Sequence, residues 1–267
     1  MKLFNQTPDT CESQHIEEIF NYLKFKLDDS FGLYVRRHEQ PIFQQQTEHG
    51  MVIILSAEGH KYTPPEINES WVLGVFMNYL LKSGNPFDPN GFIRAPRLFE
   101  LPLGTTSWFT GDDSIPINDR TYPVSFIGQY DPYTRSDLYQ FLNEKKKPDW
   151  FIHFYEGWNK GLGPEVYSEV MKQTKIAIVP CGSASLDTFR FYEAAKCGCV
   201  ILTLNQNNYE FMRGSPHIQA PNWLSSYKYI NSLLKKDLSD LSNRTKAFWV
   251  NRLSPAASAQ FILEKIL

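Results

Sequence analysis

Residues 175–204 read KIAIVPCGSASLDTFRFYEAAKCGCVILTL, and this stretch decides the fold class of the chain. Ile176–Val179 and Cys199–Leu204 are apolar and rich in β-branched residues without alternation, which is typical of parallel strands covered on both faces. Between them, Pro180–Ser185 is a turn of small residues and Leu186–Lys196 has the character of a helix. The stretch therefore predicts a βαβ unit of an α/β fold with a doubly wound parallel sheet.

The turn at Pro180–Ser185 is the expected ligand site of such a sheet, because ligands bind outside the carboxyl ends of the strands. A helix that follows the turn would offer free backbone N–H groups and its positive dipole end to an anion, most often a phosphate. One turn further on, Arg190 and Glu193 share one helix face. A fixed cation and a carboxylate beside an anion-binding turn predict a site for a nucleoside diphosphate and its ribose.

The remaining pattern divides the chain into two halves at the loop signal FTGDDSIPIND, which places the boundary near residues 110–122. In the first half we expect helices and strands without a regular order. In the second half we expect strands and helices to alternate regularly, which continues the parallel sheet. The expected strands are Gly32–Val35, Met51–Leu55, Val124–Ile127 and Trp150–Phe154. The expected helices are His15–Leu27, Ser70–Leu81, Ser136–Glu144, Glu165–Lys172, one or two within residues 226–250, and Pro255–Leu267.

Composition excludes several classes of function. The 267 residues carry a formal net charge of −2, so no global field favours nucleic acid or an anionic membrane. Four cysteines without CxxC or metal-ligand spacing predict neither disulfides nor a metal site, and favour a reducing cytoplasm. The N-terminus has no signal-peptide pattern, and the longest apolar run is too short to span a bilayer. The basic run Lys145–Lys147 favours a solvated helix end over a functional patch.

The segment Pro180–Val200, P-C-G-x-x-S-x-D-T-F-R-F-Y-E-A-A-x-C-G-C-V, resembles the donor-nucleotide motif of exostosin-type glycosyltransferases. Three weaker matches fall in the expected order: RLFELPLG at Arg97–Gly104, VSFIGQYDPYTR at Val124–Arg135, and the strand Lys175–Val179 that leads into the motif. Fucosyltransferases with the same two-lobed GT-B architecture are more distantly similar.

The resemblance implies a GT-B fold of two Rossmann-like lobes. Residues 1–115 would form a small acceptor-side lobe and residues 116–267 the nucleotide-sugar donor lobe, with the last helix able to cross back. It further implies an enzyme of polysaccharide biosynthesis that moves a sugar from a nucleotide-diphosphate donor to a saccharide-type hydroxyl acceptor. Inversion, metal independence and the absence of a cofactor other than the donor substrate come from the resemblance as well. The partners would be the nucleotide sugar and the acceptor, with no nucleic acid.

The resemblance also implies roles for residues of the donor motif. Gly182, Ser183 and Ser185 would present N–H and hydroxyl groups to the β-phosphate, although Ser185 is equally an ordinary helix cap. Arg190 would pair the charge of the diphosphate, and a salt bridge to Glu193 is the alternative. Glu193 would accept the two ribose hydroxyls, with a purely structural carboxylate as the alternative.

Other candidates lie outside the motif. Arg135 is either a second diphosphate ligand or a surface arginine, and Trp158 either flanks the base or sugar or belongs to a packed hinge. Glu58 and His60 follow the strand Met51–Leu55 and are candidate catalytic bases, or merely solvated loop residues. A non-catalytic nucleotide-binding module with a degenerate N-terminal lobe and an unrelated Rossmann-like enzyme acting on sugar phosphates remain as alternatives. The absence of GxGxxG after the first strand of either half argues against a dinucleotide oxidoreductase.

Overall fold

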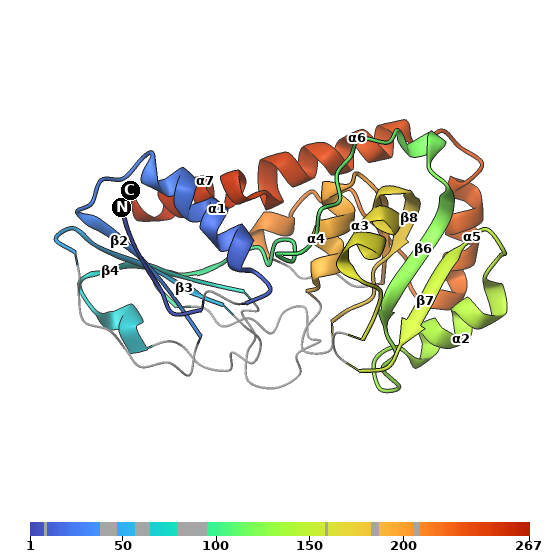
Figure 1. Ribbon diagram of the computed structural model, residues 1–267, viewed down its shortest axis with the longest axis horizontal. Helices are drawn as coiled ribbons and strands as arrows, with labels where there is room; N and C mark the ends of the chain where they lie inside the picture. The colour runs from blue at the N-terminus through green and yellow to red at the C-terminus, as the bar shows by residue number, and fades with distance from the viewer. Residues whose placement is uncertain are drawn as a thin grey trace. The chain divides into compact units, whose positions relative to one another are not determined.

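A computed structural model describes residues 1–7, 10–37, 47–56, 65–78, 95–157, 160–182, 187–204 and 209–267. The chain forms two compact units. Unit 1 comprises Met1–Ser107, Asn208–Arg213 and Asn251–Leu267, and unit 2 comprises Trp108–Asn207 and Gly214–Val250. Each unit contains a five-stranded parallel sheet and a hydrophobic core of its own (Figure 1).

The sheet of unit 1 follows the chain without reversal, in the order β1-β2-β3-β4-β5. Its strands are β1 (Lys2–Asn5), β2 (Phe31–Arg36), β3 (Gly50–Leu55), β4 (Val72–Met77) and β5 (Leu98–Glu100), and its helices are α1 (Ser13–Lys24) and α7 (Pro255–Ile266). All six residues of β3 are buried, as expected for a central strand covered on both faces. Helix α7 packs against α1 and β4, so residues from both ends of the sequence build one core.

The expected helix Ser70–Leu81 was wrong: residues 72–77 form strand β4, and residues 79–81 lie outside the described part. The sequence VLGVFM is a short, fully apolar run, for which periodicity cannot separate a buried strand from a buried helix. Residues 72–77 are extended because they pair with β3 on one side and with β5 on the other, and only an extended segment can form the backbone hydrogen bonds of both pairings. Two short edge strands, β1 and β5, were also missed.

Unit 2 is a doubly wound sheet in the order β10-β9-β8-β6-β7. Its strands are β6 (Tyr122–Gln129), β7 (Phe151–Tyr155), β8 (Thr174–Ile178), β9 (Val200–Thr203) and β10 (Ile218–Gln219), and its helices are α2 (Ser136–Lys145), α3 (Pro164–Lys172), α4 (Phe189–Lys196), α5 (Trp223–Leu233) and α6 (Ser239–Phe248). Helices α2 and α5 cover one face of the sheet, and α3 and α4 cover the other (Figure 1). This arrangement confirms the strand–helix alternation predicted for the C-terminal half.

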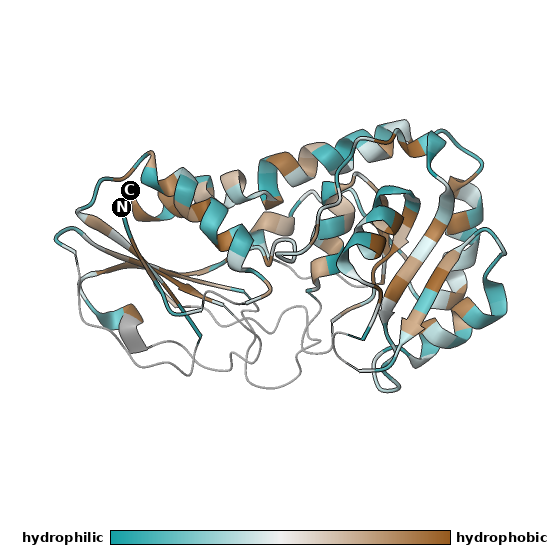
Figure 2. Cartoon of the chain, in the orientation of Figure 1, coloured by the Kyte–Doolittle hydropathy of each residue, from teal (hydrophilic) through white to brown (hydrophobic). Residues whose placement is uncertain are grey.

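Hydrophobic residues concentrate in the strands and on the inner sides of the helices within each unit (Figure 2). Short 3₁₀ turns, η1 (Pro65–Asn68), η2 (Ile117–Asp119) and η3 (Glu210–Met212), and a π-helical turn, η4 (Trp249–Leu253), complete the described structure. Among the described residues, no helix combines the length and apolar character needed to cross a membrane.

Candidate functional site

The order of strands in unit 2 locates the candidate site. Strand β6 pairs with β7 on one side and with β8 on the other, so the winding of the sheet reverses between β6 and β8. Ligands of open α/β sheets bind at this reversal, outside the carboxyl ends of the two strands. The sheet of unit 1 has no such reversal among its five strands. The loops that leave β6 and β8, residues 130–135 and 179–182, therefore frame the candidate site.

Arg135 ties these two loops together. Its Nη1 donates to the carbonyl of Gln129 at the end of β6, and its Nη2 donates to the carbonyl of Cys181 after β8, both at 2.9 Å. Only 8% of the residue is exposed, so the alternative of a surface arginine is wrong. Asp131 shapes the preceding turn by accepting hydrogen bonds from the backbone of Tyr133 and the hydroxyl of Thr134. Arg135 thus links the loops that follow β6 and β8 at the carboxyl ends of these strands.

Arg190, in the first turn of α4, lies against the backbone of β6. A β-carbon on Gly128 would stand 2.6 Å from Nη2 of Arg190, so only glycine leaves room for the guanidinium there. Two residues earlier on the same strand face, the ring of Phe126 lies under the guanidinium, 5.1 Å from ring centroid to Cζ. Nε and Nη1 of Arg190 are buried and find no hydrogen-bond partner among the described residues.

The two guanidinium groups are electrostatic neighbours. Burial first, and the positive charge of Arg190 next, lower the pKa of Arg135 to about 10. Nε of Arg135 is also buried without a hydrogen-bond partner among the described residues. Neighbouring like charges whose buried N–H donors are unused among the described residues are unfavourable unless an anion joins them. A diphosphate supplies negative charge to balance the two guanidinium groups and several oxygen atoms that can accept from their unused N–H groups.

Glu193 lies one turn after Arg190 on α4 and is 2% exposed. The hydroxyl of Tyr167, on α3, donates to Oε2 of Glu193 at 2.5 Å. Burial and the negative charge of Glu193 raise the pKa of Tyr167 well above its ordinary value, while Arg190 acts in the opposite direction. The expected alternative for Arg190, a salt bridge to Glu193, is not among the ion pairs of the described residues; the carboxylate is held by the neighbouring helix instead.

Helix α4 begins later than the sequence predicted. Thr188 has an extended backbone with φ −158° and ψ 139°, so the first helical residue is Phe189 and the expected start at Leu186 was wrong. The buried carboxyl of Asp187 accepts hydrogen bonds from the backbone of Thr188 at 3.0 Å and from the hydroxyl of Tyr192 at 3.1 Å. Local side-chain hydrogen bonds of this kind compete with helix formation, which accounts for the delay. Burial raises the pKa of Asp187 to about 7.

The structure gathers part of the predicted site and leaves the rest undescribed. Arg135, Gly182, Arg190 and Glu193 belong to the loops and the helix at the β6 and β8 ends. Gly182 is half-buried and follows Cys181, whose carbonyl Arg135 binds. The other predicted residues, Glu58, His60, Trp158, Ser183 and Ser185, lie outside the described residues.

Sequence reasoning missed Tyr167. Its only signal is indirect: right-handed crossovers from β7 to β8 and from β8 to β9 place α3 and α4 on the same face of the sheet. Such a rule makes the two helices neighbours without selecting the residues that meet. Within the part of the chain that is described, no group of three or more His, Cys, Asp or Glu side chains is arranged to hold a metal ion.

No family model matches the chain, and no curated protein matches it in sequence. Among solved structures, the chain is similar to AviGT4, a glycosyltransferase involved in avilamycin A biosynthesis, with a TM-score of 0.55, 10% identity, and 99% of this chain and 96% of AviGT4 covered. It is also similar to Anabaena HepE, solved with UDP and glucose, with a TM-score of 0.52, 9% identity, and 98% and 84% of the two chains covered. The match to the GtfA/B complex, with a TM-score of 0.48 and 10% identity, covers 97% of this chain but 62% of that one.

At such identities the likeness is one of fold. The chain has the GT-B fold, with two α/β units that are each built on a parallel five-stranded sheet, which confirms the predicted fold class. The narrower assignments to exostosin-type or fucosyltransferase-type enzymes stay predictions from the sequence.

Proposed function

We propose that the chain is a glycosyltransferase that binds a nucleoside-diphosphate sugar at the β6 and β8 ends of unit 2. The observation that carries the proposal is the pair formed by the buried Arg135 and the half-buried Arg190, whose Nε and Nη1 atoms are buried, at the reversal of a doubly wound sheet. The fold adds support, since it is shared with AviGT4 and with HepE, the latter solved with UDP and glucose. The donor nucleotide of this chain and the exostosin-type assignment both belong to the proposal.

In this proposal the diphosphate lies between the two arginines and the loop after β8. Arg190 donates from Nε and Nη1, the two atoms without a described partner, while Arg135 donates from Nε and keeps its loop-bridging hydrogen bonds. Gly182, Ser183 and Ser185 present N–H and hydroxyl groups to the β-phosphate. Glu193 accepts from the ribose hydroxyls, and its bond to Tyr167 fixes the direction of the carboxylate. Trp158 stacks on the base or sugar.

The reaction breaks the bond between the anomeric carbon and the diphosphate oxygen, and forms a bond from that carbon to an acceptor hydroxyl oxygen. Negative charge accumulates on the departing diphosphate, and the two guanidinium groups stabilise it without rearranging. The proton of the acceptor hydroxyl passes to a general base, for which Glu58 and His60 are the proposed residues. Inversion and metal independence are part of the same proposal and rest on the sequence resemblance alone.

A ligand screen by thermal unfolding tests the binding step. Each nucleoside diphosphate, with UDP, GDP and CDP as first probes, is added to the full chain, and the correct one raises the unfolding temperature by mass action. Arg190→Gln should abolish this shift. Arg244→Gln is the matched control, because Arg244 lies on α6 with its side chain 59% exposed. If no nucleoside diphosphate shifts unfolding, or if Arg190→Gln shifts like the wild type, the proposed donor site is wrong.

Turnover separates catalysis from binding alone. With the nucleotide sugar that binds, slow hydrolysis to the nucleoside diphosphate and free sugar should be measurable even without an acceptor, because water replaces the acceptor hydroxyl. Loss of this hydrolysis in Arg190→Gln supports transfer chemistry at the proposed site. A shift in unfolding temperature without any hydrolysis or transfer would instead support the non-catalytic nucleotide-binding module.

A further inference from the structure

Two basic segments far apart in the sequence meet on unit 2. The first is the run Lys145–Lys147 at the end of α2, and the second is Lys228, Lys235 and Lys236 on α5 and in the turn that follows it. Helices α2 and α5 are neighbours, and Nζ of Lys147 donates to Oδ1 of Asn231 on α5 at 3.0 Å. Lys147, the last residue of the run expected to be a solvated helix end, thus lies beside α5, and we refer to these six lysines together as the lysine patch.

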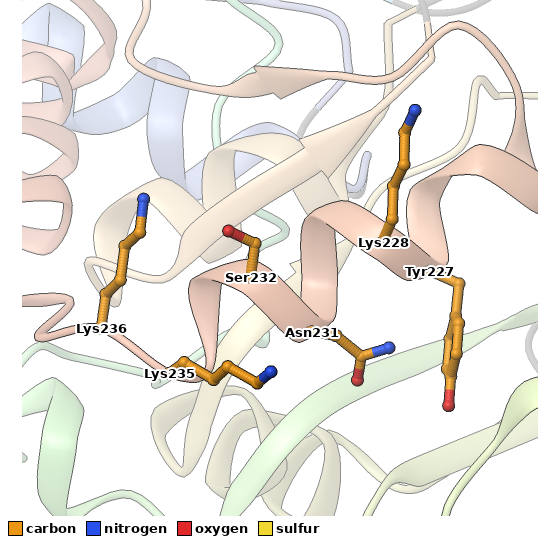
Figure 3. A pocket seen from close by; sticks show the side chains of 6 residues that line it. All are labelled: Tyr227, Lys228, Asn231, Ser232, Lys235 and Lys236. Atoms are coloured by element: carbon orange, nitrogen blue, oxygen red, sulfur yellow. The ribbon is translucent and has the colours of Figure 1, made fainter.

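The α5 side of this patch is hollowed. Figure 3 shows two rows with four-residue spacing: Tyr227, Asn231 and Lys235 project along one edge of the helix, and Lys228, Ser232 and Lys236 along the other. Together they line a hollow of about 590 Å³. Lysine, amide and hydroxyl donors thus border a shallow, open space on the surface of α5.

The lysines of the patch form no close ion pairs. Within the described part of the chain, none of the six lysines is within 4 Å of a carboxylate oxygen. Three acidic residues lie close by in sequence, Glu144, Asp149 and Asp237, so the six lysines exceed the neighbouring carboxylates by three. The lysine patch therefore carries a local excess of positive charge, although the whole chain has a net charge of −2.

We propose that the lysine patch docks unit 2 on an anionic lipid bilayer surface. Leu224 lies four residues before Lys228, in the same helical row, and is 65% exposed. An exposed apolar side chain at the end of a row of lysines is the pattern of a helix that lies in the membrane interface, with lysines at the headgroups and the apolar group at the acyl boundary. The proposal rests on this surface alone and is independent of the proposed enzymatic function.

The same contacts disfavour single-stranded nucleic acid. Its binding sites combine cations with open aromatic faces on which bases stack. Here Nζ of Lys147 lies over the ring of Tyr227 at 5.8 Å, and Nζ of Lys228 lies over the ring of Tyr229 at 5.6 Å. The patch also contains lysines rather than arginines, and lysine is a hydrated point charge that does not form the planar fork of specific phosphate readout. Lysines of this kind need no fixed phosphate geometry, so the many negative headgroups of an anionic lipid surface are a more favourable partner for them than single-stranded nucleic acid.

Vesicle sedimentation tests the proposal on the full chain. Vesicles of phosphatidylcholine alone should leave the protein in solution, whereas vesicles that also contain phosphatidylglycerol should carry it down, less so as salt is added. Each lysine near an anionic surface raises the affinity for anionic vesicles by about fivefold. The triple variant Lys228→Gln, Lys235→Gln, Lys236→Gln should therefore bind these vesicles about 100-fold more weakly. Leu224→Ser should weaken it by about tenfold, with the same dependence on salt.

A matched control removes the same charge from unit 1. Lys2, Lys24 and Lys26 are exposed there, and changing all three to Gln should leave vesicle binding as in the wild type. Circular dichroism and thermal unfolding establish that each variant is folded. Equal binding to both kinds of vesicle, equal loss in the control variant, or binding of single-stranded DNA with no binding to anionic vesicles would each overturn the proposal.

Discussion

Gly128 lies so close to Arg190 that a β-carbon on the glycine would stand 2.6 Å from the guanidinium nitrogen Nη2. One residue of the central strand β6 thereby fixes the place of a charged group on α4, the helix that follows the neighbouring strand β8. The relation is asymmetric, because the strand is rigid and the end of the arginine side chain can move.

Gly128→Ala should therefore displace Arg190 without unfolding the protein. We expect the affinity for the nucleoside diphosphate to fall by about tenfold or more, since a charge-assisted hydrogen bond is lost. The free energy of unfolding should also fall, by about 1–3 kcal/mol, because the new β-carbon would stand 2.8 Å from Cζ of the buried Phe126. Isothermal titration and urea unfolding measure the two effects. Gly163→Ala is the control, because a β-carbon there meets nothing within 4 Å. Unchanged affinity in Gly128→Ala would show that the position of Arg190 does not matter for binding.

Tyr167→Phe should destabilise the fold. The change removes the hydroxyl that donates to Oε2 of Glu193, a residue that is 2% exposed. A hydrogen bond to a charged group contributes about 1.5–3 kcal/mol, so the free energy of unfolding should fall by that amount in urea titrations. Tyr133→Phe, at a residue that is 94% exposed, should have no measurable effect. Equal stability of the wild type and Tyr167→Phe would contradict this reading of the pair.

The two arginines should respond differently to substitution. Arg135→Gln removes two hydrogen bonds that hold the loops after β6 and β8, and we expect a loss of about 2 kcal/mol in the free energy of unfolding. Arg190→Gln removes a cation with two unused donors among the described residues, and so should change stability by less than about 1 kcal/mol, or increase it. Chemical unfolding of both variants in the absence of ligand measures the contrast.

The reverse order of stabilities would mean that Arg190, not Arg135, holds the loops together. Binding of the nucleoside diphosphate supplies a second readout, in which both variants should be weaker than the wild type. Arg190→Lys retains the charge but not the fork of donors, and an intermediate affinity would identify the geometry of the guanidinium as the important property.

The local pattern predicted much of unit 2, because its strands are uninterrupted apolar runs bounded by glycine and proline. The same reasoning failed for Val72–Met77, a short apolar run in unit 1 whose periodicity does not separate a buried strand from a buried helix; only strand pairing reveals its extended form. Edge strands such as Lys2–Asn5 are short and mostly exposed, so they carry little hydrophobic pattern.

The site shows a similar limit. Arg190 and Glu193 could be proposed from their spacing on one helix, since both depend on local geometry. The bridge made by Arg135 and the pairing of Tyr167 with Glu193 depend on how loops and helices from distant segments meet. Their residue types carry no signal of these contacts, so only the tertiary structure identifies them.

Asp187 should make stability depend on pH. Burial raises its pKa in the folded state from 3.8 to about 7, so between these values the folded protein keeps a proton that the unfolded chain has lost. The unfolded state therefore binds fewer protons, and stability falls as pH rises from about 4 to about 7, by up to about 1.4 kcal/mol per pH unit. Asp187→Asn cannot ionise, its Oδ1 can still accept from the backbone of Thr188, and its Nδ2 can donate to the hydroxyl of Tyr192, so the part of the slope due to Asp187 should disappear.

A carboxyl with the opposite shift provides the control. Hydrogen bonds from Ser239 and Asn118 lower the pKa of Asp237 to about 2, so its contribution is present above the unfolded value and is lost only as pH falls toward 2. Asp237→Asn should therefore leave the slope between pH 4 and 7 unchanged. Urea titrations at several pH values compare the wild type with both variants. If Asp187→Asn keeps the slope of the wild type, another group must hold the proton, and Asp187 is ionised in the folded protein.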